Sequence, residues 1–494
     1  MHIAMLSWES MHSVALGGLA PHVTELSAGL SRLGHDIHVF TRMGEKQSRY
    51  DSIGGVHYHR CPFQHSDDFI TYVGRMCDSF VWHLAETEHF LGRPFDVVHG
   101  HDWLATPAIA RIKNTHRRPI VMTVHSTEFG RCGNSHWDDP MSRRIRDLEW
   151  EGTYVADRVI GVSKTLVRET QECYGVPADK MVSVYNGVNV TKYDGPVDTR
   201  EVRARHEVGD DDPCVLFAGR MTWQKGPDIL LEAVPGVVAQ NPRLKLLFAG
   251  DGDMRPGLET RATAIGVDSS TRFLGHRSGS DLVGLFRSSD VICVPSRNEP
   301  FGIVILEAWS ASKPVLTTRT GGPVEFVRDD YNGLTVETGI ETIGEGLRSL
   351  LADRDGARRM GSNGRRDAES RFTWDHAAVA TEAVYQSIAG PGASITTPVG
   401  GNGQEVHTMA RQKMDIPTVR PPNPRSPGDG RSAGQMMEAK GPRPTEEQVR
   451  QRAHEIFLAR NGSPGDPVAD WLQAERELRE SAALKLGKLR PQRT

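Results

Sequence analysis

Short hydrophobic runs alternate with amphipathic segments over roughly the first 390 residues of the chain. Each early run is apolar along its length and ends in small or polar residues, which is typical of buried parallel strands. We expect strands at Ile3–Trp8, Ile37–Phe40, Phe95–His99, Pro119–His125 and Asp157–Val162. After the first strand, Val23, Leu26, Leu30 and Leu33 recur at helical spacing, so a helix is expected there.

The same alternation restarts after about residue 213. Further strands are expected at Cys214–Gly219, Leu244–Ala249, Phe273–Gly275, Val291–Val294, Pro314–Thr317 and Gly333–Val336. Helices are expected at Asp228–Val238 and, as the last amphipathic segment, at Arg371–Ile388. Two consecutive βαβ series predict an α/β protein with two doubly wound, Rossmann-like domains that face each other across a cleft.

The pattern also suggests where the domains begin and end. We expect a first domain over residues 1–190, rejoined by the helix at about 371–388, and a second over residues 191–388. Gly and Pro supply 18 of the 55 positions in residues 390–444, so this stretch is predicted to be a disordered linker. Residues 445–490 regain helical spacing after a capping box at Thr445–Gln448, which predicts a small helical hairpin.

Composition narrows the classes of function. The formal net charge is −4, so no overall basic field favours nucleic acid. No apolar run approaches the roughly 18 residues of a membrane span, and the first residues do not resemble a secretory signal. The six cysteines are scattered without a Cys-x-x-Cys spacing, which favours reduced thiols in a cytoplasmic protein.

Two carboxylates stand out in the second half. Glu299 lies in a loop after the expected strand at 291–294, and Glu307 is expected about two turns into the next helix. Open parallel sheets bind ligands at the carboxyl ends of their strands, where the N–H groups of a helix N-terminus favour anions. Two carboxylates beside such N–H groups suit a ligand that carries both hydroxyls and phosphates.

Two cations follow another strand of the same half. Arg220 and Lys225 come directly after the strand that ends at Gly219. Arg offers a fork of donors and Lys a point charge, which together suit a diphosphate, although solvated cations at a turn would look the same. The carboxylate pair in the same half favours phosphate binding.

Gly17 and Gly18 open the first helix and would let backbone N–H groups approach a diphosphate, although a plain tight turn would also use them. Neither a P-loop nor a Gly-x-Gly-x-x-Gly sequence follows the first strand. The chain therefore lacks the usual signatures of P-loop ATP chemistry and of NAD binding.

Histidines follow two strands of the first half. His99 and His101 with Asp102 form a polar strand end that suits sugar hydroxyls, and a metal site is the less favoured alternative. His125 ends the next strand and could line the same crevice or be a buried structural histidine. Glu128 could be a solvated cap.

In this order, these motifs resemble the family 4 glycosyltransferases, which have the GT-B architecture. The resemblance covers about residues 1–388. It rests on Gly17-Gly18-Leu19, His101-Asp102-Trp103, Thr123-Val-His125, Asp157-Arg-Val-Ile, Asn186-Gly187-Val188, Gly219-Arg220 with Lys225-Gly226, Gly250-Asp251-Gly252, and Glu299-Pro-Phe-Gly302 with Glu307. The stretch from His99 to Arg131 and the run Leu148-Glu-Trp-Glu look like the glycogen-synthase-like branch.

The resemblance implies transfer of a hexosyl unit, most simply glucosyl, from a nucleotide-diphosphate sugar to an α-glucan or other glycoside with retention at the anomeric carbon. Arg220 and Lys225 would hold the diphosphate, so no metal and no cofactor would be required. The resemblance also implies that Glu307 binds the ribose, and that Glu299 and the N–H groups of Phe301 and Gly302 contact the donor sugar. Ile303, Gly17 and Gly18 would bind other parts of the donor. His125 would lie near the anomeric carbon, and His101 and Asp102 would line a sugar-binding cleft.

Related readings stay open. Bacterial glycogen and starch synthases carry Lys-x-Gly-Gly at the first turn, whereas this chain has Ala15-Leu-Gly17-Gly18, which argues against ADP-glucose. A nucleotide-sugar 2-epimerase and a PLP-dependent phosphorylase share the architecture, although no PLP lysine motif is evident. A non-catalytic sugar-nucleotide-binding scaffold is a further alternative. The hairpin looks like a small bacterial domain of unknown function and could bind a protein partner.

Overall fold

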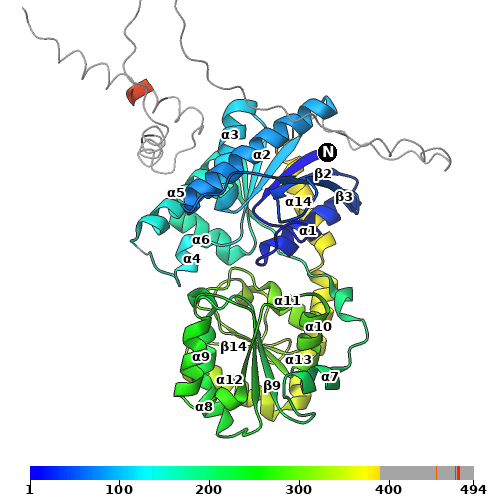
Figure 1. Ribbon diagram of the computed structural model, residues 1–494, viewed down its shortest axis with the longest axis vertical. Coiled ribbons are helices and arrows are strands. Elements are labelled where there is room, and N and C mark those ends of the chain that lie inside the picture. Colours follow the sequence, from blue (N-terminus) through cyan, green and yellow to red (C-terminus); the bar gives the residue numbers. More distant parts are fainter. Residues whose placement is uncertain (137, 390–451, 453–472, 474–475, 479–494) are drawn as a thin grey trace, which may run out of the picture. The chain divides into compact units, whose positions relative to one another are not determined.

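The computed structural model describes residues 1–136, 138–389, 452, 473 and 476–478. The linker predicted at 390–444 and nearly all of the hairpin predicted at 445–490 lie outside the described residues. Two sheets, one mainly and one fully parallel, occupy the described part of Met1–Ser394, which forms one unit (Figure 1). Among the described helices, none combines the length and hydropathy needed to cross a bilayer.

The first sheet has eight strands in the order β3-β4-β2-β1-β5-β6-β7-β8. Only β3 is antiparallel, as a hairpin partner of β4, and every other neighbouring pair is parallel. The bounds are β1 His2–Ser7, β2 Asp36–Arg42, β3 Tyr50–Ile53, β4 Val56–Cys61, β5 Val97–His101, β6 Ile120–Val124, β7 Arg158–Gly161 and β8 Met181–Ser183.

The second sheet has six parallel strands in the order β11-β10-β9-β12-β13-β14. Counted along this half, the order is 3-2-1-4-5-6, the common order of Rossmann domains. Its direction of progression reverses between β9 and β12, as it does between β1 and β5 in the first sheet. The bounds are β9 Cys214–Ala218, β10 Lys245–Ala249, β11 Thr271–Gly275, β12 Val291–Val294, β13 Val315–Thr318 and β14 Leu334–Val336.

Helices connect the strands and lie on both faces of the second sheet (Figure 1). The last helix, α14, packs against α1 of the first half, so the end of this unit returns to its beginning. The bounds are α1 Leu19–Arg32, α2 Phe69–Leu91, α3 Thr106–His116, α4 Glu128–Arg131, α5 Pro140–Val155, α6 Lys164–Tyr174, α7 Thr199–Arg205, α8 Pro227–Val238, α9 Arg255–Ala264, α10 Gly279–Ser288, α11 Ile303–Ser310, α12 Ile340–Ala352, α13 Arg354–Arg371 and α14 Trp374–Gln386.

The α/β class and the two doubly wound sheets are confirmed, and the strands expected from hydrophobic runs are found within one or two residues. The helix predicted at 371–388 is wrong at its start, because Arg371 ends α13 and Thr373 caps α14 by accepting from the His376 N–H. The strands β3, β4 and β8 and the helix α2 were not predicted. The division at residue 190 stays a prediction; β8 ends at Ser183 and β9 begins at Cys214.

Each sheet has its own apolar core. In the first half, Val23, Leu26 and Leu30 of α1 pack on β1 and β2 together with Trp374 and Tyr385 of α14. In the second half, α8, α12 and the strands of the second sheet bury a separate cluster. Two cores under two sheets leave the loops at the carboxyl ends of the strands as the places where polar side chains gather.

Candidate active site

The residues predicted to bind a ligand come from loops at the carboxyl ends of five strands. They follow β1, β5 and β6 in the first sheet and β9 and β12 in the second. The strands β1 and β5, like β9 and β12, are the neighbours between which the order of each sheet reverses. Such switch points are where open α/β sheets bind their ligands.

Lys225 and Glu299 form an ion pair across the switch point of the second sheet. The Lys225 ammonium lies 2.9 and 2.8 Å from the two oxygens of Glu299. The Ser296 hydroxyl donates a third hydrogen bond to Glu299, at 2.9 Å. Glu299 is only 4% exposed, so the pair is held where solvent screens its charges little.

Arg220, in the loop after β9, is the exposed cation of this site. Among the described residues no hydrogen bond or ion pair engages its guanidinium. Its charge is nevertheless felt across the site, because it helps to lower the pKa of both Glu9 and Asp102 in the first half, against the larger opposing effect of burial. A free guanidinium beside a fixed ammonium is a suitable pair of donors for a diphosphate.

Glu307 is the fifth residue of α11, so it lies about one turn into the helix rather than the two expected. Tyr193, which is 1% exposed, donates to its carboxylate at 3.1 Å. Burial raises the pKa of Glu307, while Lys192 and the Tyr193 hydrogen bond partly offset this effect. A half-buried carboxylate with one partner keeps acceptor positions for a pair of ligand hydroxyls.

The loop between Glu299 and Glu307 is shaped by glycines. Gly302 has φ +99°, a conformation that favours glycine, and it precedes the first residue of α11, Ile303. A side chain at Gly321 would lie 1.9 Å from the Glu299 carbonyl oxygen, so this glycine permits close backbone packing beneath the loop. Phe301 is 2% exposed and anchors the loop among aromatic rings.

Gly17 and Gly18 precede α1, and Gly18 lies beside Ile303, whose side chain would be 3.8 Å from a Cβ at Gly18. The Gly17 N–H donates to the buried carboxylate of Glu9 at 3.0 Å, and the Leu16 N–H donates to the same oxygen. The N–H that was expected to face a phosphate thus faces a carboxylate in this structure.

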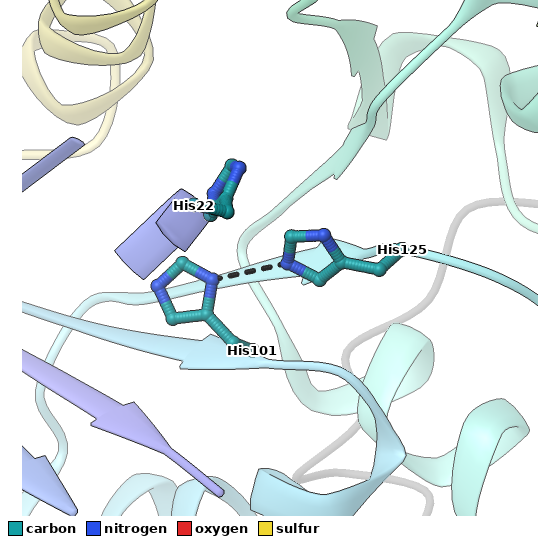
Figure 2. Close-up of side chains that lie close together, drawn as sticks. All are labelled: His22, His101 and His125. Atoms are coloured by element: carbon teal, nitrogen blue, oxygen red, sulfur yellow. Dashed lines mark hydrogen bonds between the residues drawn. The ribbon is translucent and has the colours of Figure 1, made fainter. Parts of the chain in front are cut away.

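His101 and His125, from adjacent strands, meet His22 of α1 (Figure 2). The His101 Nδ1 lies 3.3 Å from the His125 Nε2, and the His22 ring centre lies 4.4 Å from that of His125. The His22 Nδ1 pairs with the Asn186 side-chain oxygen at 2.8 Å. Asn186, which the sequence offered only as part of a family motif, therefore orients His22.

These three imidazoles are neutral at pH 7. Desolvation lowers the pKa of His125 to about 3, and it lowers those of His22 and His101 as well. A neutral imidazole can donate and accept, which suits sugar hydroxyls. Their ligand atoms lie within 4.8 Å of one another, a spacing at which a metal ion could also be held.

His99 does not take part in this group. Its two ring nitrogens are engaged by the Tyr385 hydroxyl and the Thr123 hydroxyl, each at 2.7 Å. The metal alternative built on His99 and His101 therefore has no lone pair to offer from His99 in this arrangement.

Asp102 holds the position of His125 through the backbone. It accepts from the His125 N–H at 2.9 Å, and its own N–H donates to the Thr123 carbonyl at 2.8 Å. Its φ of 60° and ψ of 174° are rare for a residue with a side chain. Asp102 thus fixes the loops after β5 and β6 relative to each other.

The loop after His125 rests on a buried ionic network. Arg131 pairs with Glu149 and, at 2.9 Å, with Glu128, while the Ser142 hydroxyl donates to Glu128 at 2.6 Å. Glu128 is 7% exposed, so the reading of it as a solvated cap is wrong. The cap of α4 is Thr127, whose hydroxyl accepts from the Gly130 N–H.

Polar contacts join the two halves next to the site. The Ser163 hydroxyl donates to the Pro300 carbonyl at 2.7 Å, and the Asn298 amide donates to Glu169 at 2.9 Å. Glu325 accepts from the Lys164 and Thr165 N–H groups, so it caps α6 of the other half. The loop that carries Glu299 is therefore tied to the first half.

Three site residues escaped the sequence reasoning: Glu9, His22 and Tyr193. His22 follows Gly18 by one helical turn and lies beside the apolar stripe of α1, so a histidine at a buried helix position was the available signal. Glu9 and Tyr193 gave no comparable signal, because Glu9 acts through backbone N–H groups of a loop and Tyr193 acts through Glu307, which is distant in sequence.

Two family descriptions cover most of this part of the chain. Residues 16–192 match Glycosyltransferase Family 4, and residues 198–367 match Glycosyl transferases group 1. A glycosyltransferase of Methanocaldococcus jannaschii, described as uncharacterized, is 36% identical over 395 residues, which cover 78% of this chain and 98% of the relative. The chain belongs to glycosyltransferase family 4. This enzyme is a hexosyltransferase.

The resemblance to glycogen synthases is confirmed. The glycogen synthase of Mycobacterium tuberculosis is 31% identical to this glycosyltransferase over 405 residues, covering 78% of this chain and 94% of the relative. At the other end of the chain, residues 444–480 match DUF2934, a protein family of unknown function. The predicted role of that segment in binding a partner stays a prediction.

Solved structures confirm the GT-B fold of the glycosyltransferase. Sucrose-phosphate synthase from Thermosynechococcus elongatus superposes with a TM-score of 0.67 at 22% identity, covering 78% of this chain and 98% of that chain. Anabaena HepE in complex with UDP-glucose superposes with a TM-score of 0.62 at 22% identity, covering 78% and 100%.

Proposed function

We propose that this glycosyltransferase moves a glucosyl unit from a nucleotide-diphosphate glucose to an α-glucan or another glycoside, with retention at the anomeric carbon and without a metal ion. The observation that carries the proposal is the grouping of Arg220, Lys225 and Glu299 at the switch point of the second sheet. The glycogen synthase relative supports glucose and an α-glucan over other hexoses and acceptors.

The cations are proposed to act on the leaving group. When the bond from the anomeric carbon to the diphosphate breaks, negative charge grows on the phosphate. The Lys225 ammonium is held in place by Glu299, and the exposed Arg220 guanidinium is free to fork onto the same oxygens. Together these two positive charges would supply what a divalent ion supplies in other transferases, so no metal step is needed.

The carboxylates are proposed to hold the rest of the donor. Glu307 would accept from the ribose hydroxyls on the side left open by Tyr193. Glu299 would accept from donor-sugar hydroxyls while keeping Lys225 in position, and the N–H groups of Phe301 and Gly302 would donate to the same sugar.

The first half is proposed to hold the sugar that reacts. His125 and His101 would offer neutral imidazoles to sugar hydroxyls, and the His125 carbonyl would face the anomeric carbon. Because the pKa of His125 is about 3, its ring is a weak base near pH 7. The proton of the acceptor hydroxyl would therefore pass to the departing phosphate oxygen.

A thermal-shift panel tests the donor. The full chain is heated with UDP-glucose, ADP-glucose, GDP-glucose and the corresponding N-acetylglucosamine donors, since a ligand that binds the folded state raises the melting temperature. We expect one glucose donor to raise it and Glu307→Gln to reduce that rise. Bound donor is then incubated with maltooligosaccharide, and the configuration of the product is measured by NMR.

The results that would overturn the proposal are distinct. If no donor raises the melting temperature, the donor assignment is wrong. If the product has the inverted configuration at the anomeric carbon, the retaining mechanism is wrong. Turnover of UDP-N-acetylglucosamine without any acceptor would identify an epimerase instead. As a further part of the proposal, the six unpaired cysteines support a reducing compartment, the cytoplasm.

A further inference from the structure

A second group of histidines lies at the opposite end of the first sheet, at the amino ends of β1, β2 and β4. This edge is near the chain end marked N in Figure 1. In the strand register, His2 stands opposite Asp36, and His38 stands opposite His57. Since Asp36 and His38 are two residues apart on one strand, all four side chains project from the same face of the sheet.

The carboxylate of Asp36 is the centre of this group. The Nε2 atoms of His38 and His57 lie 3.3 and 3.6 Å from its Oδ1, and the His2 Nε2 lies 3.9 Å from its Oδ2. Ligand atoms of His2, Asp36 and His38 lie within 4.8 Å of one another. Three imidazole nitrogens thus converge on one carboxylate.

The hydrogen bonds of His2 determine which of its nitrogens carries a lone pair. Its Nδ1 lies 3.1 Å from the Pro94 carbonyl oxygen, which can only accept, so the Nδ1 carries the proton. In the neutral ring the Nε2 is then a bare acceptor. It is buried without a hydrogen-bond partner, and it faces the Asp36 carboxylate. The two acceptors are 3.9 Å apart, so a cation between them would engage both.

The other two rings are supported in the same way. The His38 Nδ1 pairs with the His59 Nε2 at 2.9 Å, and the His57 Nδ1 pairs with the Tyr50 hydroxyl at 2.6 Å. Each imidazole therefore engages an outer partner through Nδ1 and directs Nε2 inward. Histidines that bind metals show this arrangement, in which the outer hydrogen bond fixes ring orientation and tautomer.

Arg93 is the competing cation, at 2.6 Å from the Asp36 Oδ2. Its side chain is 55% exposed and can turn outward, and it leaves the Oδ1 between the two nearer histidines.

We propose that His2, His38, His57 and Asp36 bind a divalent ion of the late first transition row, zinc by preference, as a structural site that ties together β1, β2 and β4. Three imidazoles and one carboxylate make a tetrahedral zinc set. Rings bound through Nε2 at about 2.0 Å to a tetrahedral ion have centres roughly 5 Å apart. The ring centres of His2 and His38 are 5.0 Å apart, whereas His57 is stacked on His38 at 4.5 Å and must rotate to bring its Nε2 to the ion.

The site is independent of the transfer reaction, because it lies at the amino ends of strands whose carboxyl ends carry the candidate active site. It is also half open. His2 and His38 are buried, whereas the side chains of Asp36 and His57 are 36% and 31% exposed, which leaves the ion a route of entry.

Cobalt uptake tests the proposal. The full chain, without a polyhistidine tag and freed of metal by a chelator, is titrated with Co²⁺, whose visible absorption is intense only in four-coordinate sites. We expect one equivalent bound in the micromolar range or tighter, displacement by Zn²⁺, and a higher melting temperature with either ion. His38→Gln and His57→Gln should each lower the affinity by at least about 100-fold, more than the loss of an outer partner costs.

The control is His22→Gln, which disrupts the other histidine group and should leave the four-coordinate spectrum unchanged. Because His57 is partly exposed, its variant should melt like the parent chain in chelator and keeps the test valid if His38→Gln fails to fold. Absence of the spectrum would overturn the proposal. So would a spectrum that survives His57→Gln or disappears in His22→Gln.

Discussion

Loops at the carboxyl ends of the first sheet present neutral imidazoles, whereas the corresponding loops of the second sheet present an ammonium, a guanidinium and two carboxylates. His101 and His125 are kept uncharged by burial. Lys225 is charged and paired, and Arg220 is exposed and unpaired among the described residues. The difference matches the two ends of a nucleotide sugar, because phosphates require charge and sugar hydroxyls require neutral donors and acceptors.

The two halves also hold their functional groups in different ways. In the first half, the loop after β6 rests on the buried ions Arg131, Glu128 and Glu149, which contact no ligand in the proposal. In the second half, the charged groups themselves are proposed to contact the ligand. Substitutions should therefore cost stability in the first half and activity in the second.

Arg131→Met should have the largest effect on stability. It leaves the Glu128 and Glu149 carboxylates buried without their cation, which costs about 3–5 kcal/mol in comparable cases. Urea unfolding followed by circular dichroism measures the change. Arg158→Met is the control and should stay within about 0.5 kcal/mol of the parent, because within the part of the chain that the structure describes this cation bonds only to the Asp157 carbonyl. A small loss in Arg131→Met would mean that the network does not support the loop.

Arg220→Ala should have the largest effect on activity. Removing one preorganised donor from a developing negative charge costs about 2.7–4 kcal/mol, or roughly 100- to 1000-fold in rate. The release of nucleoside diphosphate from the donor measures it. Unfolding should be unchanged, and Arg243→Ala, at an exposed arginine beside Asp212, should transfer at the parental rate. Full activity in Arg220→Ala would contradict the claim that the charged groups of the second half act on the diphosphate.

Glu307→Gln should weaken donor binding while Arg220 and Lys225 stay in place. A hydrogen bond to a charged group contributes about 1.5–3 kcal/mol, so nucleoside affinity should fall by roughly 10- to 150-fold. Calorimetric titration with the nucleoside measures this loss. A 2′-deoxy nucleoside should bind the parent and the variant almost equally, and an undiminished preference for ribose in the variant would exclude Glu307 as its ligand.

Each buried imidazole should make the free energy of unfolding depend on pH, and this should be the smallest of the four effects. The folded-state pKa of His125 is about 3, below the unfolded value near 6.5, so its contribution is present above pH 6.5 and is lost as the pH falls toward 3. For His125 the loss between pH 6.5 and 5 is about 1.6 kcal/mol. Melting curves at pH 7, 6 and 5 should show a smaller decline for His125→Gln, and an identical decline would contradict its burial as a neutral ring.

Much of this comparison could be predicted from the sequence, because strands, glycine turns and charged residues at strand ends are local signals. Arg220, Lys225, Glu299 and Glu307 were all found in this way. The pairing of Lys225 with Glu299, and of Tyr193 with Glu307, could not be predicted, since each joins residues distant in the chain.

The second group of histidines shows the same limit. His57 lies in β4, where Val56 and Tyr58 alternate with histidines, a pattern typical of a half-buried strand that was not predicted. Without the register that sets His38 opposite His57, nothing in the sequence brings these side chains to Asp36. Glu9 was missed for a related reason, because its carboxylate occupies N–H groups that the glycine motif alone assigns to a phosphate.

The central claim is that the diphosphate of the donor sits on the cations of the second half. Calorimetric titrations of the parent and of Arg220→Ala, each with the nucleoside diphosphate and with the nucleoside, test it most directly. The account predicts that Arg220→Ala lowers the affinity for the nucleoside diphosphate by at least about tenfold, the scale of one charge-assisted hydrogen bond. The affinity for the nucleoside should stay unchanged. An equal loss of affinity for both ligands, or no loss for either, would contradict it.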